Sequence, residues 1–293
     1  MSERSWLFVP GDSERKLERA ASCGADALIL DLEDSVAAAR LPAARECVLA
    51  HLNAHPTRER QRLWVRVNAL GSGRLLEDLV AVMPGVPDGI LLPKVSSNAE
   101  LNEVHHYLSA LEHAAGRAEG STGVAVIATE TPEALFAMGG YRRAPARLRA
   151  LTWGAEDLAA ALGASPPGAG DASFTFELAR ALCVVAAAAA GVQAVDGVHT
   201  AHKDAEGLSR ELARARRDGF TGKLAIHPDQ VEPINAAFTP NESELAHARS
   251  VVAAFASNPD LGVASIEGRM IDRPHLLAAQ RLLAAAERAG RRG

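Results

Sequence analysis

The segment VAVIATETPEALFAMGGYRRAPARLRALTWGAEDL (124–158) decides the fold, because it contains a short apolar run, a helical stretch and a second short apolar run. The runs at 124–129 and 148–154 are apolar and bounded by turn residues, which is typical of buried strands. Glu130 and Asp157 follow the two runs closely. Side chains at the carboxyl ends of parallel strands meet at one face of a sheet or barrel. The segment therefore predicts two carboxylates at one shared site.

The same alternation continues along most of the chain. Apolar runs separated by amphipathic helical stretches occur at 5–10, 26–32, 63–68, 89–95, 124–129, 148–154, 192–198 and 223–228. Strands that alternate with helices indicate parallel crossover units. Eight such units favour a closed (β/α)8 TIM barrel over an open sheet. The turn-rich stretch SPPGAGDAS (165–173) predicts a loop.

The pattern changes after residue 240, which predicts a barrel domain at 1–240 and a C-terminal helical extension at 241–293. Helices are expected at 242–256 and 275–289, with a loop-rich stretch between them. This extension exceeds what a barrel needs. We expect it to cover the mouth of the barrel, in its own subunit or in a neighbouring one.

Composition excludes several classes of protein. The chain has 293 residues, 48% of them hydrophobic, with a net charge of −5 and no basic stripe, so nucleic acid is not an expected partner. The longest apolar stretch (181–192) is shorter than the roughly 20 residues that span a bilayer, and no signal peptide is expected. The three cysteines lack CxxC spacing and favour free thiols in a reducing compartment. We expect a cytoplasmic protein that does not bind membranes.

Polar residues of both signs follow several of the predicted strands. Glu33 and Asp34 follow the second, Arg66 lies within the third, and Glu130 and Asp157 follow the fifth and sixth. A single acid at such a place is often only a helix N-cap, but several together indicate a site. Oxygen ligands without a His/Cys cluster favour Mg²⁺ or Mn²⁺. A neighbouring arginine would attract an anionic substrate.

An ordered set of motifs resembles the citrate lyase β-subunit-like family of the HpcH/HpaI aldolase superfamily. The motifs are RSWLFVPGDSERKLERA (4–20), DALILDLEDSV (26–36), RVNALGSG (66–73), LLPKVSS (91–97), ATETPEAL (128–135), WGAEDLAAALGA (153–164) and GFTGKLAIHPDQVEPINAAFTP (219–240). The resemblance implies a TIM barrel, Mg²⁺, a CoA thioester substrate and a homo-oligomer, either a trimer or a hexamer. It also implies Glu130 and Asp157 as metal ligands, Arg66 as a catalytic substrate-binding arginine, and Glu33 and Asp34 near the metal through waters.

The segment GRMIDRPHLLAAQ (268–280) resembles malyl-CoA and citramalyl-CoA lyase members in particular. There the resemblance implies that Asp272 is a catalytic acid/base, although its position also suits a helix N-cap. Lys16 and Arg19, and less clearly Arg15, match basic contacts to CoA phosphates, but they equally suit a solvated helix face. One departure is Ala201, which stands where relatives often carry an acid.

These observations predict a Mg²⁺-dependent carbon–carbon lyase. Its expected substrate is a 3-hydroxyacyl-CoA of the malyl-CoA, methylmalyl-CoA or citramalyl-CoA type, cleaved reversibly to acyl-CoA and glyoxylate or pyruvate. A citrate lyase β-subunit and a CoA-independent 2-oxo acid aldolase are the alternative enzymes. A metabolite-binding scaffold without catalysis is the alternative outside enzymes.

Overall fold

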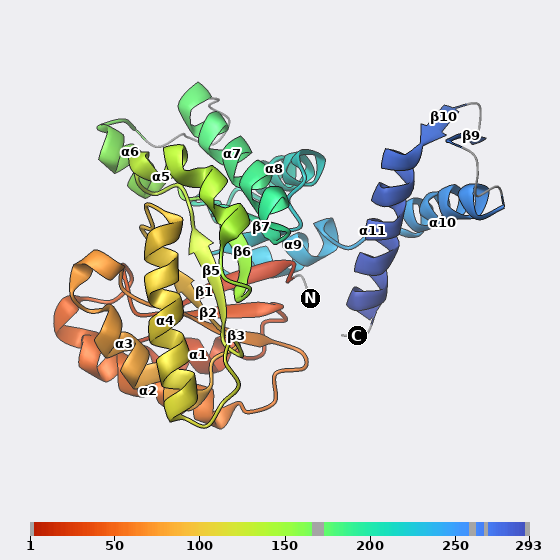
Figure 1. Cartoon of the computed structure of the whole chain (residues 1–293). Helices are drawn as coiled ribbons and strands as arrows, with labels where there is room; N and C mark the ends of the chain where they lie inside the picture. The colour runs from red at the N-terminus through yellow and green to blue at the C-terminus, as the bar shows by residue number, and fades with distance from the viewer. Residues whose placement is uncertain (1–2, 166–172, 258–261, 267–268, 291–293) are drawn as a thin grey trace. The chain divides into compact units, whose positions relative to one another are not determined.

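The computed structural model describes residues 3–165, 173–257, 262–266 and 269–290 (Figure 1). The chain divides into two compact units, one spanning Glu3–Asn235 and one that begins at Ala236. Residues 166–172 of the predicted loop lie outside the described part. No helix in the described part is long and apolar enough to cross a bilayer.

The first unit is a closed barrel of eight parallel strands, which confirms the predicted TIM barrel. The strands are β1 (Ser5–Pro10), β2 (Ala27–Asp31), β3 (Arg62–Arg66), β4 (Gly89–Leu92), β5 (Gly123–Ile127), β6 (Leu148–Thr152), β7 (Gln193–Asp196) and β8 (Gly222–Ala225). Each strand pairs with the next, and β8 pairs with β1, where Trp6 lies opposite Leu224. This closure brings all the carboxyl ends of the strands to one rim.

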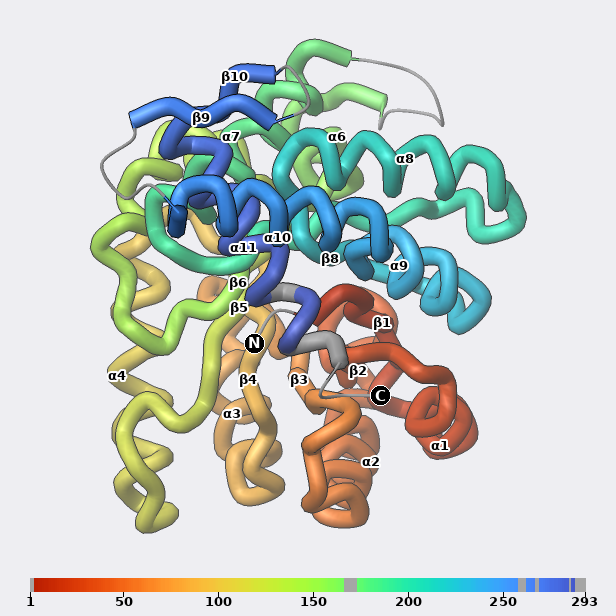
Figure 2. Tube along the Cα trace, turned by 90° about the vertical axis from the view of Figure 1, so that its right-hand side faces the viewer, coloured from red at the N-terminus to blue at the C-terminus, as the bar shows by residue number. Residues whose placement is uncertain are grey.

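Helices follow the strands in chain order. They are α1 (Glu14–Ala20), α2 (Leu41–Ala54), α3 (Leu75–Val82), α4 (Asn98–Ala114), α5 (Pro132–Ala137), α6 (Glu156–Leu162), α7 (Phe174–Ala190), α8 (Ala205–Asp218) and α9 (Val231–Ala237). Helices α1 to α4 lie side by side around the strands (Figure 2). Strand β1 ends where the sequence predicted, and the other seven strands end earlier than predicted. As a result Glu130 lies beyond the end of β5, and Asp157 lies in the first turn of α6.

Large side chains fill the interior of the barrel. The rings of Trp6 and Trp64 are 4.8 Å apart between centroids and tilted by 50°. Gly89 faces Trp64 so closely that a Cβ there would lie 2.2 Å from the ring, and therefore only glycine fits. Above them, Ile127 and Leu224 belong to the same buried cluster, and Phe8 and Val198 pack against it. These last four side chains lie at the carboxyl end of the barrel core, beneath the rim.

The second unit has its own small core. Its elements are α10 (Glu242–Ala256), β9 (Val263–Ile266), β10 (Arg269–Asp272) and α11 (Arg273–Gly290). Helix α10 begins at a capping box of Asn241 and Glu244. The prediction of a loop-rich stretch here was wrong in part, because β9 and β10 pair as antiparallel strands. Val251, Phe255 and Ile271 are buried among these elements. The covering role expected of the extension stays a prediction.

A buried ionic group under the rim is expected to contribute strongly to stability. The Asp196 carboxylate accepts hydrogen bonds from Trp153 Nε1 at 2.8 Å, Arg180 Nε at 3.0 Å and Lys223 Nζ at 3.0 Å. The Asp196→Asn variant would leave two buried cations short of negative charge, and should lower the free energy of unfolding by about 3 kcal/mol. Urea denaturation measures this loss. The exposed Asp229→Asn change is the control, and equal stability of the two variants would contradict the prediction.

Candidate active site

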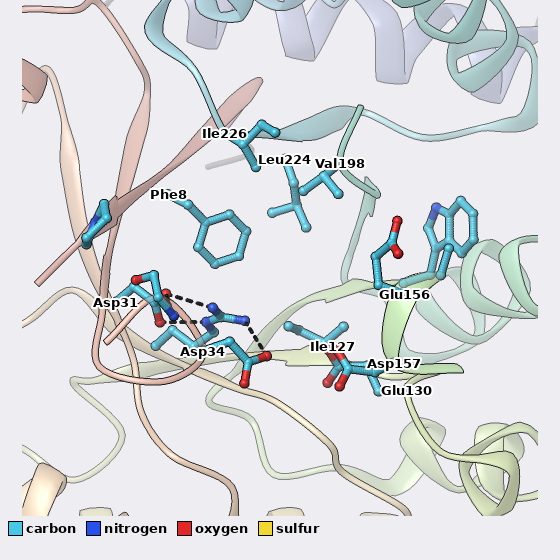
Figure 3. A pocket seen from close by; sticks show the side chains of 16 residues that line it. Phe8, Asp31, Asp34, Ile127, Glu130, Glu156, Asp157, Val198, Leu224 and Ile226 are labelled. Carbon is cyan, nitrogen blue, oxygen red and sulfur yellow. Dashed lines mark hydrogen bonds and ion pairs between the residues drawn. The ribbon is translucent and has the colours of Figure 1, made fainter. Parts of the chain in front are cut away.

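A cavity of about 420 Å³ opens at the carboxyl ends of the strands (Figure 3). Its lining combines charged and apolar side chains from β1, β2, β3, β5 and β8 and from the segments that follow β2, β5, β6, β7 and β8. The charged members are Asp31, Asp34, Arg66, Glu130, Glu156 and Asp157, and the large apolar ones are Phe8, Ile127, Trp153, Val198, Leu224 and Ile226. The site therefore has a polar side and an apolar side.

Arg66 is held rigidly at the last position of β3. Its Nε and Nη2 each donate to one oxygen of Asp31 at 2.7 Å, and its Nη1 lies 2.9 Å from Glu33 Oε2. The Phe8 ring covers the guanidinium at 4.8 Å from its centroid. Burial alone would lower the pKa of Arg66, but the Asp31 hydrogen bonds and nearby acids outweigh burial and raise it. The result is a permanent positive charge in a fixed plane.

Glu130 and Asp157 form the acidic side of the cavity, where their carboxyl groups lie close together (Figure 3). Glu130 is only 4% exposed. Burial first, and repulsion from Asp157 second, raise the pKa of Glu130 to about 8. Gly154 makes room for this side chain, since a Cβ there would lie 3.1 Å from Glu130 Cγ. The backbone hydrogen bond and the charge of Lys94 offset this rise only in part.

Lys94 contacts both the acids that follow β2 and the acids that follow β5 and β6. Its backbone N–H donates to Glu130 Oε2 at 2.5 Å. Its ammonium lies 3.1 Å from Asp34 Oδ2 and 3.4 Å from Asp157 Oδ1, and also forms an ion pair with Glu33. The residue has a positive φ of 54°, which is rare outside glycine. Strained backbone of this kind often marks a functional site.

The arrangement suits a hard divalent cation. Glu130 and Asp157 offer only oxygen ligands, which Mg²⁺ and Mn²⁺ prefer. A cation there would oppose the burial and the repulsion from Asp157 that raise the pKa of Glu130. In the described residues no three His, Cys, Asp or Glu side chains gather as a ready-made metal site. A cation on this pair would thus leave coordination positions for water and substrate.

The structure brings together most of the residues predicted from sequence. Arg66, Asp34, Glu130 and Asp157 line one cavity, and Glu33 contacts Arg66 beside it. The sequence prediction missed the contacts of Lys94, although it noted the motif in which Lys94 lies. It also gave no role to Phe8 or Trp153. The sequence gives only a weak signal that Phe8 and Trp153 line a site, because apolar residues in or after a strand usually fill a core.

The remaining predicted residues belong to α1 and to the second unit. Lys16 and Arg19 are exposed on α1. Asp272 ends β10 in the second unit, where its Oδ1 lies 2.5 Å from His275 Nδ1, and its side chain is half exposed. Their predicted roles in CoA binding and acid/base chemistry stay predictions.

Relatives of known name match nearly the whole chain. The chain is 36% identical to the citrate lyase subunit beta of Escherichia coli strain K12 over 295 residues, which covers 99% of this chain and 95% of the relative. It is also 36% identical to a (3S)-malyl-CoA thioesterase of Cereibacter sphaeroides over 290 residues, covering 97% and 94%.

A solved structure supports the same relationship. The protein CitE of Mycobacterium tuberculosis, crystallised in complex with magnesium, acetoacetate and coenzyme A, superimposes with a TM-score of 0.77 at 34% identity. The match covers 97% of this chain and 98% of that one. The family model "HpcH/HpaI aldolase/citrate lyase" matches residues 4–228, and a model of carbon–carbon bond lyases of the TIM-barrel fold matches residues 178–290. The chain therefore belongs to the HpcH/HpaI aldolase/citrate lyase family and is a carbon–carbon lyase.

Proposed function

We propose that the protein cleaves, reversibly and with Mg²⁺, the carbon–carbon bond of a short 3-hydroxyacyl-CoA thioester. The products would be an acyl-CoA and glyoxylate or pyruvate. The observation that carries this proposal is the single cavity in which Arg66 faces the Glu130–Asp157 pair. The magnesium and coenzyme A in the Mycobacterium tuberculosis relative support it.

Glu130 and Asp157 would hold the cation, and Mn²⁺ could take its place. When bound, the cation supplies Lewis-acid stabilisation of negative charge on oxygen. Arg66 would bind the substrate carboxylate and stabilise charge on the reacting carbonyl oxygen, because Asp31, Glu33 and Phe8 fix its guanidinium in advance. The apolar side of the cavity would exclude water from the reacting bond.

In the cleavage direction, water would accept the proton of the substrate hydroxyl, which becomes a carbonyl. The bond to the thioester α-carbon breaks, and its electron pair forms an enolate. Asp272 would then give a proton to that carbon, and would remove it in the direction of synthesis. The overall reaction neither gains nor loses a proton.

We also propose that the protein works as a homo-oligomer, a trimer or a hexamer, in which Asp272 comes from the same or a neighbouring subunit. Lys16 and Arg19 are exposed and positively charged, so they are able to meet the phosphates of CoA. A cytoplasmic location suits Cys23, Cys47 and Cys183, which are free thiols.

Two related activities must be compared directly with the proposed lyase activity. The Escherichia coli relative favours the role of a citrate lyase β-subunit, and the Cereibacter sphaeroides relative favours hydrolysis of malyl-CoA. A panel of malyl-CoA, methylmalyl-CoA, citramalyl-CoA and citryl-CoA, with separate assays for oxo acid and free CoA, distinguishes these reactions. The proposal predicts oxo acid without free CoA from one of the first three thioesters, and preferred cleavage of citryl-CoA would favour the citrate lyase role instead. Free CoA without oxo acid, or turnover of 2-oxo acid aldols that lack CoA, would contradict it.

The raised pKa of Glu130 predicts that Mg²⁺ affinity depends on pH. Below pH 8 a proton competes with the cation for Glu130, so the affinity should fall about tenfold for each pH unit between pH 8 and pH 6. Calorimetric titrations in buffers of different ionisation enthalpy should detect about one proton released per cation at pH 7. Glu130→Gln should weaken binding and abolish this pH dependence. Affinity that is constant from pH 6 to pH 8 in the unmodified protein would contradict the raised pKa, and unchanged affinity in Glu130→Gln would exclude Glu130 as a ligand.

A further inference from the structure

Lys94 contacts four acidic side chains around the candidate metal site. Its backbone N–H holds Glu130 Oε2, and its ammonium pairs with Glu33, Asp34 and Asp157. The ammonium is therefore in contact with one candidate metal ligand, Asp157, and the backbone of the same residue is in contact with the other.

Acidic side chains outnumber the cations around Lys94, and this imbalance makes its ion pairs important. Five carboxyl groups gather at this part of the rim, belonging to Asp31, Glu33, Asp34, Glu130 and Asp157. Arg66 directs its guanidinium mainly to Asp31 and Glu33. Among the residues that the structure describes, the Lys94 ammonium is the cation that pairs with Asp157, and it lies closer to Asp34 than Arg66 does, at 3.1 Å against 3.9 Å. The acids nearest the open cavity thus depend on Lys94 for neutralisation.

The backbone at Lys94 explains how one residue reaches both acidic regions. Strand β4 ends at Leu92, and the positive φ at Lys94 turns the chain sharply two residues later. An amino acid with a side chain rarely adopts this conformation, so the surrounding contacts must stabilise it. The turn points the N–H toward Glu130 after β5, whereas the long side chain reaches the acids after β2.

We propose that Lys94 is a built-in counter-ion of the metal site. In the metal-free enzyme its ammonium takes the place of the divalent cation among Asp34, Asp157 and Glu33, and so prevents these acids from repelling one another. Glu130 and Asp157 would hold the divalent cation, whose charge would replace that of Lys94 and would repel the ammonium. This inference rests on the proposed function, because it assumes that the Glu130–Asp157 pair binds a divalent cation.

The test is the Mg²⁺ affinity of the full-length protein without substrate, measured by calorimetry for the unmodified chain and for Lys94→Met. Loss of the ammonium removes its repulsion of the cation, so the dissociation constant should decrease about tenfold. The metal-free variant should also melt about 3 °C lower than the unmodified protein, because its acids are no longer neutralised. Saturating Mg²⁺ should remove most of this difference.

Three further variants make the result specific. Lys94→Arg keeps the charge and should restore both the Mg²⁺ affinity and the metal-free melting temperature. Lys94→Gly removes the ammonium but accepts the positive φ, so it should bind Mg²⁺ as tightly as Lys94→Met, and it replaces that variant if Lys94→Met fails to fold. Lys203→Met removes the same charge from an exposed loop before α8 and should change neither quantity.

The Mg²⁺ affinity of Lys94→Met either supports or overturns the counter-ion role of Lys94. Weaker Mg²⁺ binding by Lys94→Met would show that Lys94 positions the ligands instead of replacing the cation, and unchanged binding would reduce the contact to an ordinary ion pair. Both results overturn the counter-ion role while leaving the proposed lyase intact. If the unmodified protein binds no Mg²⁺ at all, the proposed function and the counter-ion role fall together.

Discussion

Replacement of Arg66 by lysine is expected to lower kcat/KM for the CoA thioester by about two to three orders of magnitude. Lysine keeps the charge but cannot reproduce the paired hydrogen bonds to Asp31, nor can it present a planar group beneath Phe8. The charge would then lie on a flexible chain, and the substrate would no longer meet donors fixed in advance. Steady-state kinetics with the best substrate of the thioester panel measures the effect.

A matched control lies on the same strand. Arg62 begins β3 at its amino end and pairs with Asp88 at 2.8 Å, far along the strand from the cavity that Arg66 lines. Arg62→Lys should therefore leave kcat/KM within about twofold of the unmodified enzyme, since substitutions away from a site have small effects. If Arg66→Lys is as active as Arg62→Lys, Arg66 does not bind the reacting group.

Asp272→Asn is the second change with a large expected effect. The variant should lose about two to four orders of magnitude in kcat, because asparagine cannot give or take the proton at the α-carbon. Exchange of the α-protons of acetyl-CoA in D₂O, followed by NMR, should disappear as well. Mg²⁺ affinity should stay unchanged, since Asp272 is not one of the expected ligands.

Two controls accompany this variant. Glu242→Gln removes an exposed acid from α10 of the same unit and should leave exchange unaffected. A mixture of Asp272→Asn and Arg66→Lys subunits should regain activity if Asp272 serves a neighbouring subunit, and should stay inactive if it serves its own. Normal exchange in Asp272→Asn alone would remove Asp272 from the mechanism.

The sequence predicted the barrel and the composition of its rim well. Buried strands are short apolar runs, and their repeated alternation with amphipathic helices has few physical solutions other than parallel crossovers. Once strands are parallel, every polar residue after a strand is brought to one rim, and for this reason Arg66, Glu130 and Asp157 line one cavity as predicted. Which residues reach the rim depends only on the order of the strands and helices, not on their exact ends.

Other features depended on information that the sequence pattern does not contain. The role of Lys94 follows from a positive φ and from contacts to residues as distant in sequence as Glu33, neither of which a local pattern encodes. The strands β9 and β10 have four residues each and mixed exposure, so their sequence lacks the clear alternation that marks a half-buried strand. The position of Asp272 relative to a substrate also stays a prediction.

The most direct test of the account is a crystal of the protein soaked with Mn²⁺ in place of Mg²⁺, with anomalous diffraction measured to locate the ion. We expect one strong anomalous peak coordinated by carboxylate oxygens of both Glu130 and Asp157, within the cavity lined by Arg66. A fully occupied ion elsewhere in the molecule, with these two carboxylates turned apart and bound to none, would contradict it.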